Sequence, residues 1–529
     1  MTMPPPWGST WPSLEAFREL ARDRRVIPVV RRLLGDDLTP IDIYRRLAAD
    51  RPGTFILESA EFDGAWSRWS FVGVRSRATL TVDAADGAGR PGAARWLGDV
   101  PAGIPAAGDV LEVLGAALEA LHTPAIPGLP PLTGGFVGAL GWDVLRHWEP
   151  TLRALAPDEL RVPELSLCLA TDLVAVDHMD GSVWLIANAI NFDASDSGVD
   201  EARADAVARL DAMEAELLEP RATGAAVLDE SVSEPELRFR TSRDDYVRAV
   251  LAAKEAIRDG EVFQVVISQR LELDCPAEPL DVYRVLRTIN PSPYMYYVRL
   301  ADASGSEFSV VGSSPETLVK VTDDEVTTFP IAGSRPRGAT PAADRALADE
   351  LLDDPKERAE HLMLVDLSRN DLAKVCRPES VELVEFMAVK RYSHIMHITS
   401  TVVGSLRPGA TALQTLIATF PAGTLSGAPK PRAIEIIDAL EPARRGIYGG
   451  TVGYFDFAGN MDMAIAIRTA LVRDGVASVQ AGAGLVADSV PEREYQESRD
   501  KAAAAVRAIQ VAARLRPAGG SSGEPGPGR

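Results

Sequence analysis

Four glutamates at helical spacing are the first residues in this sequence that could do chemistry. Glu357 and Glu360 lie three residues apart in one predicted helix. Glu494 and Glu497 repeat that spacing in a second helix, and Lys501 follows four residues later. Residues three or four apart share one face of a helix. One glutamate from each helix would suit a hard cation such as Mg2+, which prefers oxygen ligands. For either pair alone, a solvated helix face is the simpler interpretation.

Two histidines, His394 and His397, could supply a general acid near neutral pH. They lie three residues apart, within or just after a predicted strand. Residues three apart in a strand point to opposite faces, so only one of the two would face a site. For either histidine alone, a hydrogen-bonded structural position is the simpler interpretation.

Three segments of small residues flanked by hydroxyls form a further candidate group: 330–334, 421–427 and 481–485. Glycine lets a ligand approach the backbone, and exposed N–H groups bind carboxylates. Arg468 could add a bidentate grip on an anion. Ordinary turns explain each segment singly, whereas together they indicate a pocket for a small polyanionic ligand beside a metal.

The elements that must position these residues mix strands and helices without a regular βαβ alternation. Strands are predicted at 55–58, 69–74, 79–82, 262–273, 295–300, 308–312, 381–389, 451–457, 461–471 and 476–481, and helices at 202–218, 242–260, 342–352, 356–373, 431–440 and 491–515. This order predicts an α+β protein with large antiparallel β-sheets. The predicted division is an N-terminal region (1–220), a linker (221–240), a second domain (241–515) and a disordered tail (516–529).

Composition excludes several classes of function. The chain has 529 residues, 46% of them hydrophobic, and a formal charge of -21. Such a charge repels phosphate backbones and anionic membranes, so we expect no nucleic-acid partner and no membrane association. We find no signal peptide and no apolar run long enough for a membrane span, and three scattered cysteines form no disulfide framework. A cytoplasmic location is therefore expected.

The same segments, in the same order, resemble the chorismate-utilising enzymes and, within them, the anthranilate synthase component I family. The match runs from about residue 13 to 515. The strings that carry it are Phe263–Ser268, Asn290–Met295, Gly312–Glu316, Pro330–Ser334, Glu360–Asp371, Tyr392–His397, Pro421–Lys430 and Gly482–Glu497. The resemblance implies a sandwich-like core of antiparallel sheets with helices outside. It also implies Mg2+-dependent conversion of chorismate and ammonia to anthranilate and pyruvate, through aminodeoxyisochorismate, as the first step of tryptophan biosynthesis.

The resemblance assigns residues to parts of that reaction. Glu360 and Glu497 look like the Mg2+ ligands, with Glu494 and Glu357 supporting the metal site. His397 matches the catalytic histidine, which we expect to protonate the departing C4 hydroxyl, because hydroxide is a poor leaving group. By the same resemblance, the pocket is lined by Gly333, Ser334 and Thr424. The residues that resemble the family's binding site for the enolpyruvyl carboxylate are Tyr448, Arg468, Gly482, Ala483, Gly484 and Lys501.

Two positions separate sister activities. Isochorismate and salicylate synthases place a water-activating lysine where Gln264 stands, and aminodeoxychorismate synthases place a lysine where Ala332 stands. Both differences favour anthranilate as the product. Ser334 departs from the family, which more often has threonine there. The alternatives are an aminodeoxychorismate or aminodeoxyisochorismate synthase, or a non-catalytic regulatory subunit that binds tryptophan.

The N-terminal region carries strings that resemble a tryptophan feedback site. L-Tryptophan would bind between the two parts of the chain and act as an inhibitor. The residues concerned are Leu57, Glu58, Ser59, Pro293, Tyr294 and Met295. No cysteine lies in a glycine-flanked nucleophile elbow, so a separate glutamine amidotransferase subunit (component II) is expected to supply ammonia. A heterotetramer of two large and two small subunits is the assembly that the resemblance implies.

Overall fold

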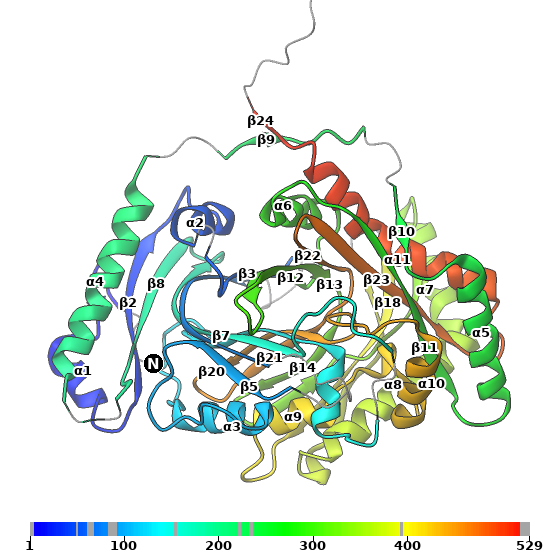
Figure 1. The fold of residues 1–529 in the computed structure, drawn as a ribbon, viewed down its shortest axis with the longest axis horizontal. Coiled ribbons are helices and arrows are strands. Elements are labelled where there is room, and N and C mark those ends of the chain that lie inside the picture. Colours follow the sequence, from blue (N-terminus) through cyan, green and yellow to red (C-terminus); the bar gives the residue numbers. More distant parts are fainter. Residues whose placement is uncertain are drawn as a thin grey trace, which may run out of the picture.

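The computed structural model describes residues 5–48, 51–60, 68–82, 92–152, 156–193, 195, 197–220, 224–231, 236–391 and 395–518. Figure 1 shows strands crossing the middle of the molecule, with most helices at its periphery. The helices are α1 (Leu14–Leu20), α2 (Pro40–Leu47), α3 (Val110–Ala120), α4 (Val199–Leu218), α5 (Arg243–Arg258), α6 (Pro279–Ile289), α7 (Pro341–Asp353), α8 (Pro355–Ala373), α9 (Ala412–Thr419), α10 (Lys430–Leu440) and α11 (Pro491–Ala512), with 3-10 turns η2 (Trp142–His147), η3 (Pro378–Ser380) and η4 (Gly423–Leu425).

The strands are β1 (Thr10–Trp11), β2 (Val26–Leu34), β3 (Thr54–Glu58), β4 (Trp69–Val82), β5 (Ala94–Gly98), β6 (Gly135–Leu140), β7 (Leu165–Asp177), β8 (Ser182–Ile190), β9 (Ala226–Val227), β10 (Arg238–Phe239), β11 (Gln264–Asp274), β12 (Tyr294–Ala301), β13 (Glu307–Ser314), β14 (Thr317–Thr322), β15 (Glu325–Thr328), β16 (Ile331–Pro336), β17 (Glu382–Arg391), β18 (Ile395–Ser405), β19 (Gly427–Ala428), β20 (Thr451–Asp456), β21 (Met461–Ile465), β22 (Thr469–Arg473), β23 (Val476–Leu485) and β24 (Arg516–Pro517). Twenty-two of them belong to one connected sheet. The strands pair antiparallel, which confirms the predicted α+β class.

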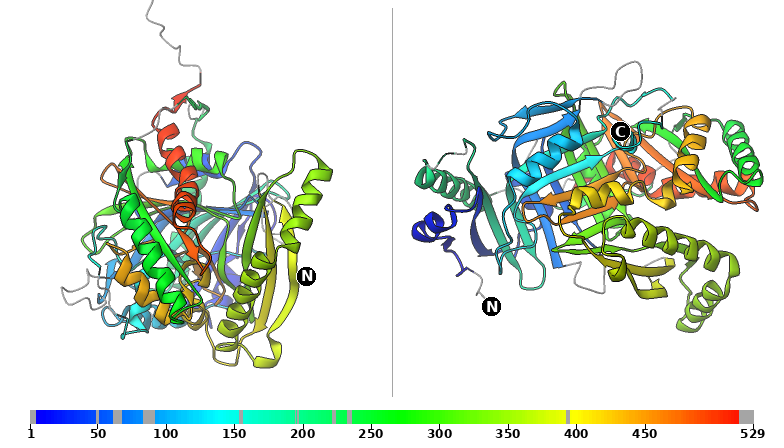
Figure 2. Two further views of the ribbon diagram at one scale, coloured as in Figure 1. Left: turned by 90° about the vertical axis from the view of Figure 1, so that its right-hand side faces the viewer. Right: turned by 90° about the horizontal axis from the view of Figure 1, so that it is seen from below.

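The two parts of the chain share that sheet. Strand β3 pairs with β12, with Glu58 opposite Met295. Strand β6 pairs with β20, with Leu140 opposite Thr451. Helix α3 of the first part and helix α9 of the second also lie side by side (Figures 1 and 2). The two parts are therefore continuous in structure, and the boundary at about residue 220 separates sequence regions rather than separate sheets.

The helices that carry the acidic clusters begin at recognisable signals. Asp354 caps α8, accepting from the backbone N–H of Lys356 at 3.0 Å, and Pro355 occupies the first turn. Such a cap satisfies N–H groups that have no partner inside the helix. Helix α11 also begins with proline, Pro491, and its apolar face, including Ala505 and Ile509, packs into a core cluster. The predicted helix extended to 515, but α11 ends at Ala512.

One strand predicted as continuous is two separate strands in the structure. Residues 461–471 were expected to form a single strand, but the structure has β21 and β22 with a break at Arg468, whose φ is +52°. The reason is a change of neighbours: β21 pairs with β14 and β20, and β22 pairs with β13 and β23. A non-glycine residue with positive φ is uncommon and marks functional positions more often than chance.

The predicted tail also differs from expectation at its start. Arg516 and Pro517 form β24, which pairs with β9 in the segment predicted as a linker. Backbone hydrogen bonding between the two segments thus orders residues that were expected to be disordered. Figure 1 shows this strand pair at the top of the molecule. Among the described residues, none of the helices is long and apolar enough to cross a membrane.

Candidate active site

The two acidic helices bring their glutamates to one place. Burial raises the pKa of Glu360, and repulsion from Glu357 and Glu497 raises it further, so α8 and α11 direct like charges at each other. Burial likewise raises the pKa of Glu494, and Glu497 adds to the shift. Lys501 Nζ lies 2.7 Å from Glu497 Oε1 and 3.2 Å from the Gly482 carbonyl oxygen. Like charges held together in this way favour binding of a cation.

Carboxylate oxygens are the type of ligand that Mg2+ prefers, but this site offers few of them. In the described part of the chain, no group of three or more His, Cys, Asp or Glu side chains is gathered at metal-binding spacing. Glu360 and Glu497 would thus be the protein ligands of a Mg2+ ion that completes its shell with water and substrate oxygens, the usual pattern for this ion.

His397 lies beside the Gly333 bulge. Strand β16 pairs with β18 so that Ser334 is opposite His397, and the register shifts between Ala332 and Ser334. The Nδ1–H of His397 donates to the Gly333 carbonyl at 3.0 Å. Burial lowers the pKa of His397, the bond to Gly333 opposes this, and Arg468 lowers it again. With Nδ1–H bound to Gly333, the protonated ring can give a proton from Nε2, as the general-acid prediction requires, and the neutral ring presents Nε2 as an acceptor.

The surroundings of position 333 accommodate only glycine without strain. Its φ is +68°, and an added Cβ would lie 2.9 Å from Glu357 Oε2. Glycine adopts this conformation without strain. The close approach links β16, with His397 beside it, to the first turn of α8. Ser334, which was predicted to line the pocket, is exposed.

Glu316 is the site residue that sequence reasoning missed. It lies between β13 and β14, in the Gly312–Glu316 string, and its Oε1 accepts a hydrogen bond of 2.8 Å from the Thr424 hydroxyl. The residue keeps some solvent contact, but protein atoms surround its carboxyl. This burial raises the pKa of Glu316 to about 7, although Thr424, Lys501 and Arg468 all act to lower it. The available signal was an acid in a segment of small and apolar residues.

Arg468 is a largely enclosed cation. Its side chain donates to the Lys501 carbonyl oxygen at 3.1 Å. Among the described residues, no carboxylate oxygen lies within 4.0 Å of its guanidinium. Burial accordingly lowers the pKa of Arg468, an effect that Tyr448, Glu316 and Glu497 oppose. Burying a cation without an ion-pair partner costs free energy, and a bound anion would offset that cost.

The glycine strand β23 provides backbone close to these groups. Gly482 and Gly484 pair with Ser268 and Val266 of β11. An added Cβ would lie 2.6 Å from the Ile267 carbonyl oxygen at Gly482 and 2.7 Å from Gln264 Nε2 at Gly484. Ala483 lies between them, is fully buried and pairs with Ile267, so it offers no side chain to a ligand.

Two further predicted residues, Gln264 and Tyr448, are also buried near this region. Gln264 lies against β23, and Tyr448 lies near Arg468. Gln264 is 3% exposed, and its Oε1 has no hydrogen-bond partner among the described residues. Tyr448 is 8% exposed, close enough to Arg468 and Glu316 to interact with both charges. Apart from Ser334, which is exposed, and Ala483, which offers only backbone, the structure therefore gathers the predicted side chains around one region. His394 lies outside the described residues.

A cavity of about 350 Å3 is lined by all six residues of the predicted tryptophan site. Its walls come mainly from strands of the shared sheet, namely β3, β4, β12, β14, β16, β17, β18, β20 and β21. Glu58 is fixed at its edge, because Oε2 accepts from the Tyr283 hydroxyl at 2.6 Å and Oε1 from Arg287 at 3.2 Å. Ser59 Oγ is buried without a partner in the described structure. A mainly apolar cavity with a few oriented polar groups is typical of a small-molecule site.

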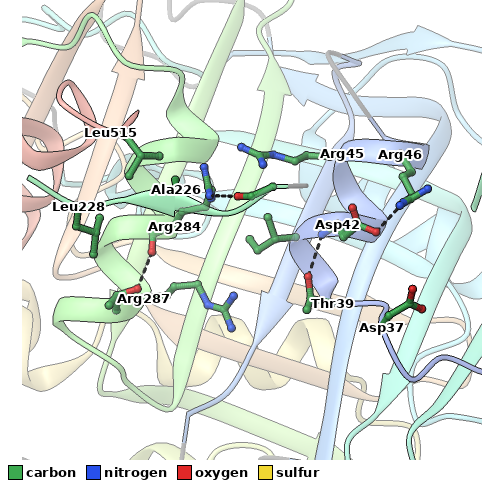
Figure 3. Close-up of a pocket in the computed structure, with 13 residues that line it drawn as sticks. Asp37, Thr39, Asp42, Arg45, Arg46, Ala226, Leu228, Arg284, Arg287 and Leu515 are labelled. Atoms are coloured by element: carbon green, nitrogen blue, oxygen red, sulfur yellow. Dashed lines mark hydrogen bonds and ion pairs between the residues drawn. The ribbon is translucent and has the colours of Figure 1, made fainter. Parts of the chain in front are cut away.

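Another cavity, of about 580 Å3, lies between α2 and α6 (Figure 3). Four arginines line it, and each is matched by a carboxylate. Arg46 pairs with Asp42, Arg45 and Arg284 pair with Asp281, and Arg287 pairs with Glu58. Because these charges are already compensated and none of the candidate catalytic residues lines this cavity, we do not assign it to the reaction.

Comparison with known proteins fits this geometry. The family model for chorismate binding enzyme matches residues 67–507, and the chain belongs to that family. Anthranilate synthase component 1 of Arthrobacter globiformis is 58% identical over 96% of this chain and 94% of its own length. The protein of the same name from Mycolicibacterium smegmatis is 53% identical over 95% of this chain and 94% of its own. The predicted resemblance to anthranilate synthase component I is thereby confirmed.

Two solved structures have a similar fold. Anthranilate synthase component I from Streptococcus pneumoniae superimposes with a TM-score of 0.71 at 33% identity, covering 89% of this chain and 98% of that one. The menaquinone-specific isochorismate synthase of Escherichia coli has a TM-score of 0.65 at 18% identity, covering 94% and 99% respectively. This second likeness concerns the fold alone.

Proposed function

We propose that this chain converts chorismate and ammonia to anthranilate and pyruvate, as the large subunit of an anthranilate synthase. The observation that carries the proposal is the enclosed Arg468 guanidinium, which has no carboxylate partner in the described structure and lies beside Glu316 and Lys501. Such a group is suited to an anionic substrate. Gln264 supplies no base to activate water, and Ala332 supplies no nucleophile, which supports ammonia as the group that attacks C2.

The two carboxylates of chorismate have separate partners in this proposal. Arg468 and the N–H groups of the 482–484 strand bind the enolpyruvyl carboxylate, with Lys501 and Tyr448 beside them. Glu360 and Glu497 would hold a Mg2+ ion at the ring carboxylate. When bound, this ion supplies charge neutralisation and polarisation of that carboxylate. The supporting observation is the raised pKa of Glu360, which reflects first burial and then repulsion from Glu357 and Glu497, and a bound cation would relieve that repulsion.

We assign the general acid for loss of the C4 hydroxyl to Glu316. At neutral pH a carboxyl with a pKa of about 7 holds its proton in a substantial fraction of molecules. The lowered pKa of His397 and its Nδ1–H bond to Gly333 favour a neutral ring, which orients substrate or accepts a proton. As water leaves from C4, ammonia has bonded to C2. Loss of the C2 proton and of pyruvate then gives the aromatic product.

We further propose that L-tryptophan occupies the cavity of about 350 Å3 and inhibits the reaction. Pro315 and Thr317 line that cavity, and Glu316 lies between them in the chain. Movement of this segment would therefore connect an occupied cavity to the general acid. The name component 1 carried by relatives implies a second component. We propose that it is a glutaminase that supplies ammonia; the heterotetramer and the cytoplasmic location remain predictions.

Product analysis tests the proposal. Purified chain is incubated with chorismate, Mg2+ and ammonium at alkaline pH, and products are separated and identified by mass. Anthranilate with equimolar pyruvate is expected. Isochorismate or an accumulating aminated intermediate would assign a sister activity, and no turnover would favour a binding subunit.

A further inference from the structure

We infer that Arg445 and Glu441 are a positioning pair that holds the substrate-binding elements in register. The pair is enclosed, with side chains 1% and 4% exposed. Arg445 Nε lies 2.9 Å from Glu441 Oε2, and a second guanidinium nitrogen lies 2.6 Å from Oε1. Bidentate pairing of this kind fixes the planes of both groups. The hydrogen bonds of the two side chains in the described structure go to each other, Leu425, Val266 and Ser268, and not to the proposed acid or metal ligands.

The remaining bonds of Arg445 reach two separate walls of the site. One nitrogen donates to the Leu425 carbonyl at 2.7 Å, in the η4 turn that carries Thr424. Another donates to the Val266 carbonyl at 2.9 Å, in β11, two residues after Gln264. A single guanidinium therefore sets the separation between the turn whose hydroxyl binds Glu316 and the strand that bears Gln264.

Glu441 completes the connection. Its Oε1 accepts from both the backbone N–H and the hydroxyl of Ser268, each at 2.8 Å. Ser268 is the β11 residue opposite Gly482 in the ladder. The carboxylate therefore fixes β11 beside the glycines of β23, which are the backbone donors proposed for the substrate carboxylate.

Two aromatic rings extend the arrangement. The guanidinium carbon of Arg445 lies 4.3 Å from the centroid of the Trp142 ring and 5.5 Å from that of Tyr448. Trp142 belongs to the N-terminal region, is 1% exposed and follows β6. A guanidinium placed above an aromatic ring is attracted to it by a cation–π interaction. Arg445 thus connects the N-terminal region with Tyr448, a predicted substrate residue.

The geometry predicts a change in substrate use as well as in stability. Breaking a buried ion pair by removing one partner destabilises a protein in any location. A purely structural pair would therefore lower the melting temperature and leave the remaining folded enzyme unchanged. Loss of a positioning pair would in addition displace Thr424 and β11, and a misplacement of about 1 Å can cost roughly a hundredfold in rate.

Arg146 offers a matched control. It is 3% exposed, pairs with Asp143 and Asp438, and donates to the Leu152 carbonyl at 2.7 Å. It thus has the same kind of enclosure, ion pairing and carbonyl contact as Arg445. The carbonyl that it holds does not adjoin a candidate site residue.

The experiment compares Arg445→Lys with Arg146→Lys in the full chain, because lysine keeps the charge but cannot reach all the acceptors of a guanidinium. Melting temperature, kcat and the KM for chorismate are measured with saturating ammonium and Mg2+. We expect both variants to lose thermal stability, but only Arg445→Lys to lose roughly ten- to hundredfold in kcat/KM for chorismate.

This inference rests on the proposed reaction, and the two can fail separately. If the wild-type chain turns over no chorismate, the proposed function fails. If the wild type is active and Arg445→Lys keeps its kcat/KM, or if Arg146→Lys loses as much, the positioning pair is overturned. Should Arg445→Lys not fold, Glu441→Asp, which keeps the charge and withdraws the carboxylate by one methylene, is compared with Asp438→Glu in the same assays.

Discussion

The Thr424 hydroxyl donates to Glu316 Oε1 at 2.8 Å, across 108 positions of sequence, and this bond holds a carboxyl whose burial raises its pKa to about 7. Burial favours the neutral acid, whereas the Thr424 bond and the charges of Lys501 and Arg468 favour the ionised form. The balance leaves Glu316 able to exchange a proton near neutral pH. General acids work best in that range.

Replacing Glu316 with glutamine should lower kcat by roughly two to four orders of magnitude, the usual contribution of a positioned acid. In the wild type the protonated form is the active one, so kcat should fall as pH rises through about 7. Steady-state rates are compared at equal concentrations of unprotonated ammonia. In Glu316→Gln that falling limb should disappear. A wild-type profile that rises steadily with pH would remove Glu316 from the acid position.

The same substitution should change stability in a pH-dependent way. The folded pKa of Glu316 lies above its unfolded value, so its contribution is fully present at low pH and is lost as pH rises through about 7. Glutamine cannot ionise. Relative to wild type, Glu316→Gln should therefore gain melting temperature between pH 5 and pH 8. Parallel melting curves for the two proteins over that range would contradict the raised pKa.

The Thr424 hydroxyl can be tested without removing the acid. Thr424→Val keeps the shape of the side chain and removes the donor that stabilises the ionised carboxyl, so the pKa of Glu316 should rise further. The falling limb of the pH–rate profile should move to higher pH. Thr424→Ser restores the hydroxyl and should return the limb to its wild-type position. An unmoved limb in the valine variant would separate Thr424 from the acid.

Much of this site could be predicted from local patterns, because its helices follow from periodicity and end signals that act over a few residues. Asp354, Pro355 and Pro491 begin α8 and α11 where the sequence places them, and helical spacing puts their glutamates on one face. The strand predicted at 476–481 is the first part of β23, which continues through the glycine segment to Leu485. These features depend on neighbours in the chain, which the sequence displays directly.

The features that were missed depend on distant contacts. Burial of its carboxyl raises the pKa of Glu316, and the groups that oppose this, Thr424, Lys501 and Arg468, all lie far away in the chain. The break at Arg468 arises because β21 and β22 pair with different strands, which the local sequence does not reveal. The order of Arg516 and Pro517 depends on pairing with β9. Tertiary context decides each case.

Removing Arg468 should separate binding from stability. Its guanidinium is enclosed without a carboxylate partner in the described structure, so Arg468→Met deletes a desolvated charge and should leave the melting temperature unchanged or raise it. Chorismate binding should nevertheless fall by at least tenfold, the order expected for a lost charge-assisted contact. Isothermal titration and thermal melting test both. Loss of stability together with unchanged affinity would make Arg468 a structural residue.

Metal dependence should follow the glutamates. Glu360→Gln or Glu497→Gln should abolish Mg2+-dependent turnover while the protein remains folded. Because burial and neighbouring glutamates raise the pKa of Glu360, and the metal needs the ionised carboxylate, Mg2+ affinity should weaken as pH falls. Glu492→Gln, an exposed acid on the same helix α11, serves as the control. Wild-type Mg2+ response in both site variants would contradict the assignment.

Tryptophan inhibition should depend on Glu58, whose carboxylate the Tyr283 hydroxyl and Arg287 hold at the edge of the cavity. A fixed carboxylate can bind an ammonium group without losing further conformational freedom, and burial strengthens that contact. Glu58→Gln should raise the tryptophan concentration for half-inhibition by roughly tenfold or more, while kcat and the KM for chorismate stay near wild type. Tyr283→Phe keeps the charge and removes one of its two anchors, so it should cause a smaller shift in the same direction. Inhibition curves at saturating chorismate measure both. Equal inhibition of all three proteins would show that tryptophan acts elsewhere.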